Sequence, residues 1–155
     1  MQTFLPYADF SKSAACLDPK RLNKQIVECK QILAALSGES KGYANHPATK
    51  QWEGYTECLD YYARCMCHDY FIRNHKKHAM SSVFGLHFRD YNPPWLGYEP
   101  YHSMHRAVLL DKDPAWYGQF GWTEQPAKQY LNKGRMSYPY IWPSKMEKFQ
   151  TKESI

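Results

Sequence analysis

The chain has 155 residues, a formal net charge of +5 and a mean hydropathy of −0.72. No apolar run approaches the ~20 residues that span a bilayer, and the first residues lack the basic-then-apolar pattern of an export signal. We therefore expect a protein that neither spans a membrane nor is exported, with its five cysteines as free thiols in a reducing cytoplasm. The length predicts one domain, 1–155, able to bury about 68–70% of the surface of its unfolded chain.

Residues 1–7 are predicted to be extended, and Asp9 or Ser11 caps a short helix that runs to about Cys16. The next helix is predicted at 19–36, because Asp18 suits an N-cap, Pro19 suits the first helical position and Gly38 ends the pattern. Its apolar residues follow the four-three spacing of a buried face: Leu22, Ile26, Cys29, Leu33 and Leu36. Its polar face carries Arg21, Lys24, Gln25, Glu28 and Gln31. On spacing alone this face is an ordinary solvated surface, with a Lys24–Glu28 pair worth about 0.2–0.5 kcal/mol.

A turn at 42–47 leads into a second long helix, predicted from about 48 to 75. Residues 80–100 are predicted to form a long loop. Loops of this length are usually either functional or disordered, and the aromatic residues of this one favour packing, so an ordered loop is expected. A third helix is predicted at 100–110 and a short fourth one from Asp113-Pro114. The aromatic segment 121–143 is irregular, and 144–155 is predicted to be a frayed tail. Since no segment has the alternation of a strand, the fold class is all-α, with a few packed helices and long aromatic-rich loops.

Two further features suggest possible sites. Residues 73–78 gather three cations and two histidines, and aromatic residues make up 16% of the chain. Basic residues interleaved with exposed aromatics suit a nucleic-acid surface, although tyrosines between 52 and 71 are expected to fill the core. Cys58, Cys65 and Cys67 with nearby histidines suggest zinc, but Cys65 and Cys67 point apart on a helix, so no metal site is expected. These cysteines are predicted to be small buried residues.

Two blocks of the chain resemble the pyrimidine-dimer DNA glycosylase family, the endonuclease V type of DNA repair enzyme. The first block begins with a Leu-Asp-x-Lys-x-Leu motif, has a glutamate eleven residues after the first leucine and ends in a Gly-Tyr-x-x-His-Pro turn. Its matching residues are Leu17, Asp18, Lys20, Leu22, Glu28, Gly42, Tyr43, His46 and Pro47. The second, looser block runs from His105-Arg106 through Leu109-Leu110 to Asp113-Pro114-Ala-Trp116-Tyr117.

The resemblance implies a glycosylase that also cleaves the strand at the abasic site, using an amine as nucleophile and the carboxylate of Glu28. The family's amine is the N-terminal α-amino group, whose ordinary pKa of about 7.7–8.0 leaves a useful fraction unprotonated at neutral pH. Here Met1 precedes Gln2, a residue before which methionine is not normally removed, so either Met1 or Lys24 is expected to supply the amine. The family arginine that precedes the glutamate is Val27 in this chain.

The expected partner is duplex DNA, bound by a monomer in the cytoplasm at the nucleoid or at a viral genome, without a metal or nucleotide cofactor. The candidate DNA-binding residues are Arg21, Gln25, His46, Arg73, Lys76, Lys77, Trp95, His102, His105, Arg106, Trp116 and Tyr117. The histidines are candidates for phosphate contacts or acid–base work, although a lone histidine is more often structural. Two alternatives remain open: a non-catalytic nucleic-acid-binding module, and a hydrolase of free nucleosides or nucleotides.

Overall fold

The computed structural model describes residues 1–85, 91–127, 130–132 and 135–149, and their fold is mainly helical. The elements are α1 (Phe10–Cys16), α2 (Pro19–Ser37), α3 (Pro47–Lys50), α4 (Thr56–Asn74), α5 (Glu99–Lys112), α6 (Pro114–Tyr117), β1 (Tyr130–Asn132) and β2 (Arg135–Ser137). The all-α class is therefore confirmed. The expectation that the chain has no strand is wrong at one place, because β1 and β2 pair as a short antiparallel hairpin.

Helix α2 begins and ends as predicted. Pro19 occupies its first turn, and Gly38 ends it with a left-handed φ of 84°, which costs glycine little. Asp18 stands at the N-cap, but its side chain makes no capping bond: it accepts hydrogen bonds from Arg21 and from the Tyr117 hydroxyl. The predicted apolar face is buried at Leu22, Ile26 and Cys29.

The single helix predicted from 48 to 75 is wrong. The chain forms a short helix, α3, and then turns before α4 begins at Thr56. Gly54 lies in this turn with φ 83°, a conformation that L-residues rarely adopt, so the helix cannot run through it. Residues on both sides of the turn are nevertheless buried in the core: Trp52 precedes the turn, and Leu59, Tyr62 and Met66 share the inner face of α4.

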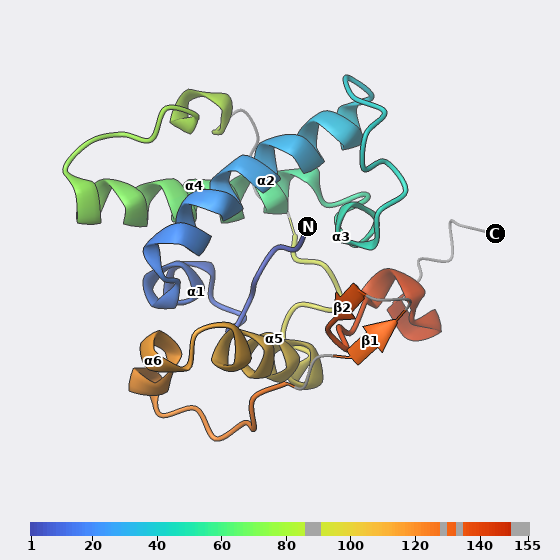
Figure 1. Cartoon of the computed structure of the whole chain (residues 1–155). Coiled ribbons are helices and arrows are strands. Elements are labelled where there is room, and N and C mark those ends of the chain that lie inside the picture. The colour runs from blue at the N-terminus through green and yellow to red at the C-terminus, as the bar shows by residue number, and fades with distance from the viewer. Residues whose placement is uncertain (86–90, 128–129, 133–134, 150–155) are drawn as a thin grey trace.

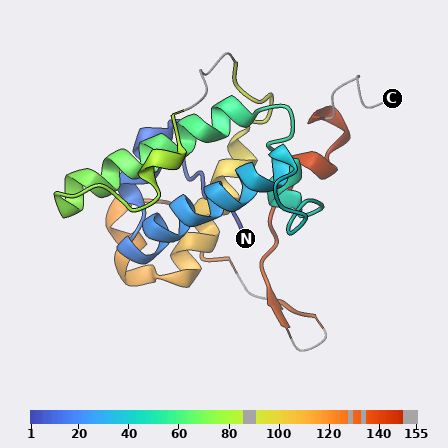
Figure 2. The same cartoon turned by 90° about the horizontal axis from the view of Figure 1, so that it is seen from above.

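The helices form two layers with the start of the chain between them (Figure 1). Helix α2 packs along α4, which also packs on α1, and these three make one layer. Helices α5 and α6 make the other. The N-terminal segment runs between the layers, and the chain begins near the middle of the molecule, beside α2 in the second view (Figure 2). An extended segment in such a place has no backbone partners of its own, so its polar groups depend on side chains.

The C-terminal part closes the side of the molecule near α3. The hairpin projects from the body (Figure 2), and 3₁₀ turns at Pro143–Lys145 and Glu147–Phe149 follow it. Phe149 packs edge-on against Tyr98 at the start of α5, 5.2 Å between ring centroids. Residues 150–155 of the predicted tail lie outside the described residues. All five cysteines are free thiols, four of them buried. No described helix combines the length and apolar character needed to cross a membrane.

Candidate active site at the N-terminus

The N-terminal segment is held by side chains of α2 and α4. Gln25 of α2 accepts a hydrogen bond from the Phe4 amide (2.6 Å) and donates one to the Gln2 carbonyl (2.9 Å). The Tyr62 hydroxyl of α4 donates to the Phe4 carbonyl at 2.7 Å and also contacts the Gln25 side-chain oxygen. Gln25 is 1% exposed and uses both the oxygen and the nitrogen of its side-chain amide, so it holds residues 2 to 4 in place.

Helix α5 holds the next residues of the same segment from the other layer. The Leu5 amide donates to Nδ1 of His105, and Nδ1 of His102 bonds the Leu5 carbonyl, both at 2.8 Å. Arg106, one residue further along, donates to the Pro6 carbonyl at 2.7 Å. The expectation that 102, 105 and 106 share a face is correct, and that face is occupied by the start of the chain.

Both buried histidines are held in their neutral form. Burial is the largest cause that lowers the pKa of His105, to about 3, and nearby His102 and Arg106 lower it further. Burial likewise lowers the pKa of His102. A neutral His105 accepts from Leu5 through Nδ1 and carries its proton on Nε2, as this bond requires.

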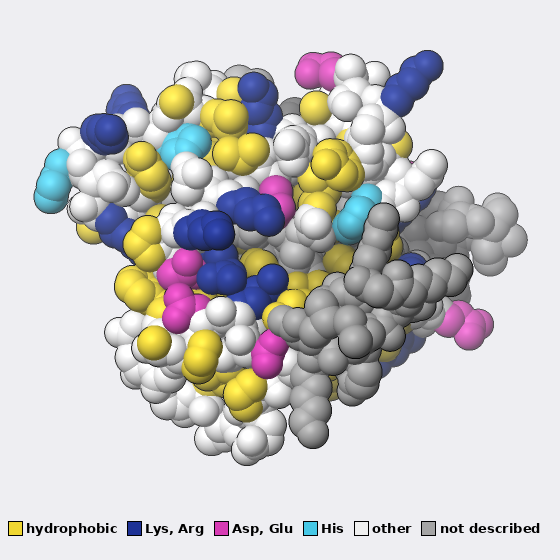
Figure 3. Space-filling view, in the orientation of Figure 1, with side chains coloured by type: hydrophobic (Ala, Val, Ile, Leu, Met, Phe, Trp, Pro, Cys, Tyr) yellow, Lys and Arg dark blue, Asp and Glu magenta, His cyan; other side chains and the backbone are white. Residues whose placement is uncertain are grey.

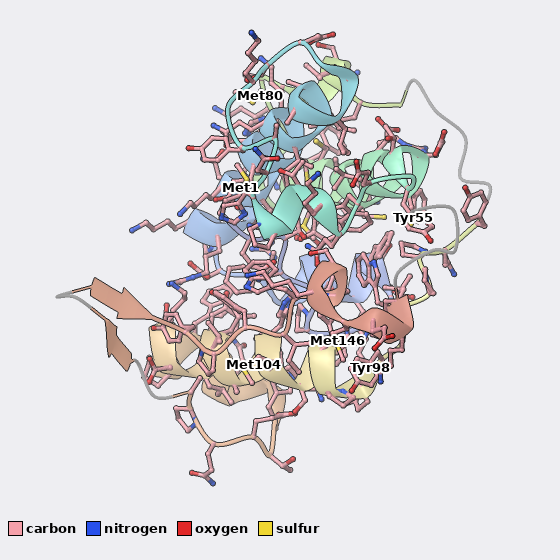
Figure 4. All side chains as sticks on the ribbon, turned by 90° about the vertical axis from the view of Figure 1, so that its right-hand side faces the viewer. Met1, Tyr55, Met80, Tyr98, Met104 and Met146 are labelled. Atoms are coloured by element: carbon pink, nitrogen blue, oxygen red, sulfur yellow. The ribbon has the colours of Figure 1, made fainter. Side chains whose placement is uncertain are left out.

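Glu28 lies where the segment ends. Its Oε2 accepts a hydrogen bond from the backbone N–H of Gln2 at 3.3 Å and another from the side-chain Nε2 of Gln25 at 3.1 Å. Its Oε1 lies 3.7 Å from Nζ of Lys24. The carboxyl side chain is 8% exposed. Because the Gln2 nitrogen is bonded to the carbonyl carbon of Met1, the α-amino group of Met1 lies close to this carboxylate. Figure 4 shows Met1 between the ribbons of α2 and α3.

Amine and carboxylate share a hollow of about 230 Å³. Its lining residues are Met1, Gln2, Phe4, Lys20, Arg21, Lys24, Gln25, Glu28, Lys112 and Tyr140. Figure 3 shows Lys and Arg side chains gathered near the centre of this face. The pKa of Lys112 is lowered, mainly because the side chain is buried and also because the positive charges of Arg21 and Lys24 repel its own. The hollow thus offers positive charge around a single carboxylate, which suits a phosphodiester ligand.

His46, the N-cap of α3, is influenced by the charge of the α-amine. Burial lowers its pKa below the ordinary value, and the positive charges of the α-amino group and of Lys145 add to this. Its Nδ1 accepts from the Ala48 amide at 3.0 Å and caps α3, so the neutral ring carries its proton on Nε2. Tyr43, one turn earlier, is 52% exposed and has φ 63°, a strained backbone conformation for this residue.

The family model described as pyrimidine dimer DNA glycosylase matches residues 1–82, just over half of the chain. The chain belongs to this family. No curated protein sequence and no solved structure gives a significant match. The match covers the N-terminal segment and α2, which together supply most of the hollow, as well as His46 and α4, whereas α5 and the C-terminal part lie beyond it. The function of the pyrimidine dimer DNA glycosylase family requires contact with DNA, and the positive charge around the hollow is compatible with such contact.

The structure brings several predicted site residues of this glycosylase together. Met1, Arg21, Lys24, Gln25 and Glu28 all line the hollow, and the pKa of His46, which does not line it, is lowered in part by the charge of the α-amine. Gln25 and Glu28 were expected on a solvated face and are instead buried, because the N-terminal segment lies over them.

Other predicted residues are engaged elsewhere. Arg73 donates to the carbonyls of Ala14, Ala15 and Leu17 at the end of α1. Arg106 is paired with Glu99 and Glu124 as well as with Pro6. Trp95 is 2% exposed in the core, and the Trp116 indole donates to the Cys16 carbonyl. Tyr117 is buried against Asp18. Lys76 and Lys77 are exposed beyond the end of α4 and do not line the hollow.

Five lining residues had no role in the sequence-based prediction of the site: Gln2, Phe4, Lys20, Lys112 and Tyr140. Lys20 belongs to the family motif and could have been included. Lys112 ends α5 and Tyr140 lies in the irregular C-terminal segment, and neither has a local pattern that would mark it.

A larger hollow of about 540 Å³ lies on the other side of the 42–47 turn, between Lys50, Tyr55, Trp95 and Lys145. Its one acidic residue, Glu53, is paired with Lys50 at 3.7 Å, and no α-amine is present there. Among the described residues no cluster of His, Cys, Asp or Glu could hold a metal ion. The smaller hollow therefore has the chemistry of a reaction site.

Proposed function

We propose that this protein is a DNA glycosylase with AP-lyase activity that acts on damaged or modified pyrimidines in duplex DNA. The observation that carries the proposal is the hydrogen bond from the Gln2 amide to Glu28. This bond keeps the α-amino group of Met1 beside a carboxylate inside a basic hollow. Membership in the family supports base removal, and the pairing of amine with carboxylate supports cleavage of the strand as well.

The reaction begins when the lone pair of the α-amine attacks C1′ of the target nucleotide. The new N–C1′ bond replaces the bond to the base, whose electron pair leaves with the pyrimidine, and the base gains a proton lost by the amine. The sugar ring then opens with proton transfer to O4′, leaving a protonated imine on Met1. Loss of a proton from C2′ expels the 3′ phosphate. In this proposal Glu28 carries these protons.

The α-amine of Met1 is a better nucleophile here than Lys24. The ordinary pKa of an α-amine is about 7.7–8.0, against about 10.4 for a lysine. A lysine reacts at neutral pH when burial or neighbouring cations disfavour its charged form. Lys24 is 63% exposed, and Glu28 lies 3.7 Å from it. Lys112 is the second lysine to consider, since its pKa is lowered by burial and by two neighbouring cations.

The substrate must present C1′ outside the base stack. Extruding a nucleotide costs a few kcal/mol, and less where pairing is already weakened by damage, which favours lesions over normal sites. Lys20, Arg21, Lys24 and Lys112 around the hollow would bind the flanking phosphates. The reaction needs no metal or nucleotide, and one chain holds all its groups, so we expect a monomer that works on the DNA of a nucleoid or viral genome in the cytoplasm.

Reduction of the imine by borohydride tests the proposal. The protein is incubated with a duplex that carries one abasic site, reduced, digested and analysed by mass spectrometry. A covalent adduct on the Met1 α-amine is the expected result. An adduct on Lys24 or Lys112 would keep the reaction but change the nucleophile. Tight, salt-sensitive DNA binding without an adduct would favour a non-catalytic module, and hydrolysis of free nucleosides alone would favour a nucleoside hydrolase.

A further inference from the structure

The side chain of Gln2 leaves a polar group unpaired in the wall of the hollow. Gln2 is 4% exposed, and its Oε1 accepts a hydrogen bond from the Thr3 amide at 2.9 Å. Its Nε2 is buried and has no hydrogen-bond partner among the described residues. Leaving a buried donor unpaired costs about 1–3 kcal/mol, so an unpaired amide group needs an explanation.

The orientation of this amide follows from the backbone. If oxygen and nitrogen were exchanged, the NH₂ group would face the N–H of Thr3, and two donors would meet. The oxygen therefore belongs on the side of Thr3, and the NH₂ group belongs on the other side. Gln2 is bonded directly to Met1, and its own backbone amide contacts Glu28. Gln2 also lines the hollow together with Met1 and Glu28, so its unpaired donors belong to the same site as the proposed nucleophile and carboxylate.

A leaving pyrimidine needs a donor at this place. When the bond to C1′ breaks, its electron pair spreads from N1 of the base onto O2, the carbonyl oxygen on C2 and the base oxygen nearest to C1′. A donor fixed beforehand at the position where negative charge develops lowers the barrier without further reorganisation. A residue next to the one that attacks C1′ is well placed to reach O2.

We infer that Gln2 is a catalytic residue for base removal, and that its side-chain NH₂ group binds O2 of the departing pyrimidine. The inference rests on the proposed function, since it requires attack at C1′ by the neighbouring amine. It assigns Gln2 a role in the first half of the reaction alone. An abasic site has no base, so the second half, cleavage of the strand, has no use for the donor.

This division makes the inference testable. Gln2→Glu keeps an oxygen for the Thr3 amide and removes the donors, and Gln2→Met removes both. Neither residue is small, so Met1 stays in place. Base release, scored as cleavage of the N–C1′ bond of one pyrimidine because the dimer linkage still joins that base to its neighbour, is measured in single turnover on a duplex with one ultraviolet-induced pyrimidine dimer. Strand cleavage is measured on a duplex of the same sequence with a preformed abasic site. Gln31→Met is the matched control, because Gln31 is exposed on the same helix that carries Glu28.

Both Gln2 variants are expected to release the base about 10²-fold more slowly, as for loss of a donor to a developing anion. They should cleave the abasic duplex, and form the borohydride adduct, at the wild-type rate. Unchanged base release would overturn the inference. Equal slowing of both reactions would overturn it too, because it would show that Gln2 merely supports the amine. Absence of both reactions in the wild-type protein would instead contradict the proposed function.

Discussion

The backbone amide of Leu5 donates its hydrogen bond to Nδ1 of His105, 2.8 Å away and 100 residues later in the chain. His105 is fully buried, and this bond exists only while its Nδ1 is unprotonated. Folding therefore fixes the protonation state of the ring, and the ring fixes the path of the segment that ends at the α-amine. The stability of the fold and the position of the N-terminal segment therefore both depend on this side chain.

Replacing His105 with Asn should flatten the dependence of stability on pH. The pKa of His105 falls from an ordinary 6.5 to about 3 in the fold, so the unfolded chain binds its proton first as pH falls. Between these two pKa values, His105 should lower the wild-type free energy of unfolding by up to about 1.4 kcal/mol for each unit by which the pH falls. Asn keeps an acceptor for Leu5 and cannot titrate.

Urea unfolding at pH 7, 6, 5 and 4 measures this effect. The His105→Asn variant is expected to be less stable at pH 7 and to lose less stability than the wild-type protein on acidification. His46, His78 and His102 also have lowered pKa values, but they are common to both proteins and cancel in the comparison. Parallel curves for the two proteins would show that His105 does not hold this bond in its neutral form.

Sequence periodicity predicted the helices well where a helix packs one face on the core. The prediction of 19–36 corresponds to Pro19–Ser37, and 100–110 corresponds to Glu99–Lys112. It failed at 48–75, where Gly54 in a left-handed turn separates α3 from α4. It also missed the β1–β2 hairpin, whose three-residue strands are too short to show an alternating pattern.

Only part of the candidate site could be predicted from the sequence, because several of its residues owe their position to a distant segment of the chain. The resemblance named Glu28 and the N-terminal amine, and both line the hollow. Periodicity placed Gln25 on a solvated face, since nothing in a local pattern reports that a distant extended segment will cover it. The same holds for His102 and Arg106, which share a face as expected but bond the backbone of Leu5 and Pro6. Tertiary packing of the N-terminal segment decided these roles.

Replacing Gln25 with Met should weaken the fold and the reaction together. The change removes the partners of the Phe4 amide, the Gln2 carbonyl and one contact of Glu28, all of them buried. Since each buried group left unpaired costs about 1–3 kcal/mol and the losses are not additive, a total near 3 kcal/mol is expected. Urea unfolding and abasic-site cleavage measure the two effects. Gln31→Met, exposed on the same helix, is the control and should change neither. A stable but inactive Gln25→Met protein would contradict the conclusion that Gln25 holds the N-terminal segment in place.

Replacing Glu28 with Gln should stop strand cleavage and leave DNA binding intact. The amide oxygen can still accept from the Gln2 amide, so the amine keeps its place, but the side chain no longer takes up protons. A fall of about 10²–10⁴-fold in cleavage of an abasic duplex is expected. Binding is followed by fluorescence anisotropy. Glu39→Gln, in an exposed position after α2, is the matched control. Cleavage at the wild-type rate would remove Glu28 from the mechanism.

Lys20 and Arg106 should respond differently to replacement by Gln. Lys20 is exposed at the hollow, so its loss should weaken DNA binding and reduce the slope of log K against log salt by about 1. Arg106 is engaged with Glu99, Glu124 and the Pro6 carbonyl, so its loss should lower stability and leave the slope unchanged. Titrations at several salt concentrations and thermal melts separate the two. A reduced slope for Arg106→Gln would return that residue to the DNA interface.

A Gly-Ser extension before Met1 should abolish strand cleavage without abolishing DNA binding. The extension moves the free α-amine away from Glu28 and turns the Met1 nitrogen into an amide, which is not nucleophilic. The four cations of the hollow stay in place, so affinity for an abasic duplex should be largely kept. The same dipeptide added after Ile155 is the control and should leave cleavage unchanged. Lys24→Gln and Lys112→Gln should also retain cleavage. If the extended protein cleaves at full rate while one of these lysine variants does not, that lysine, rather than Met1, forms the imine.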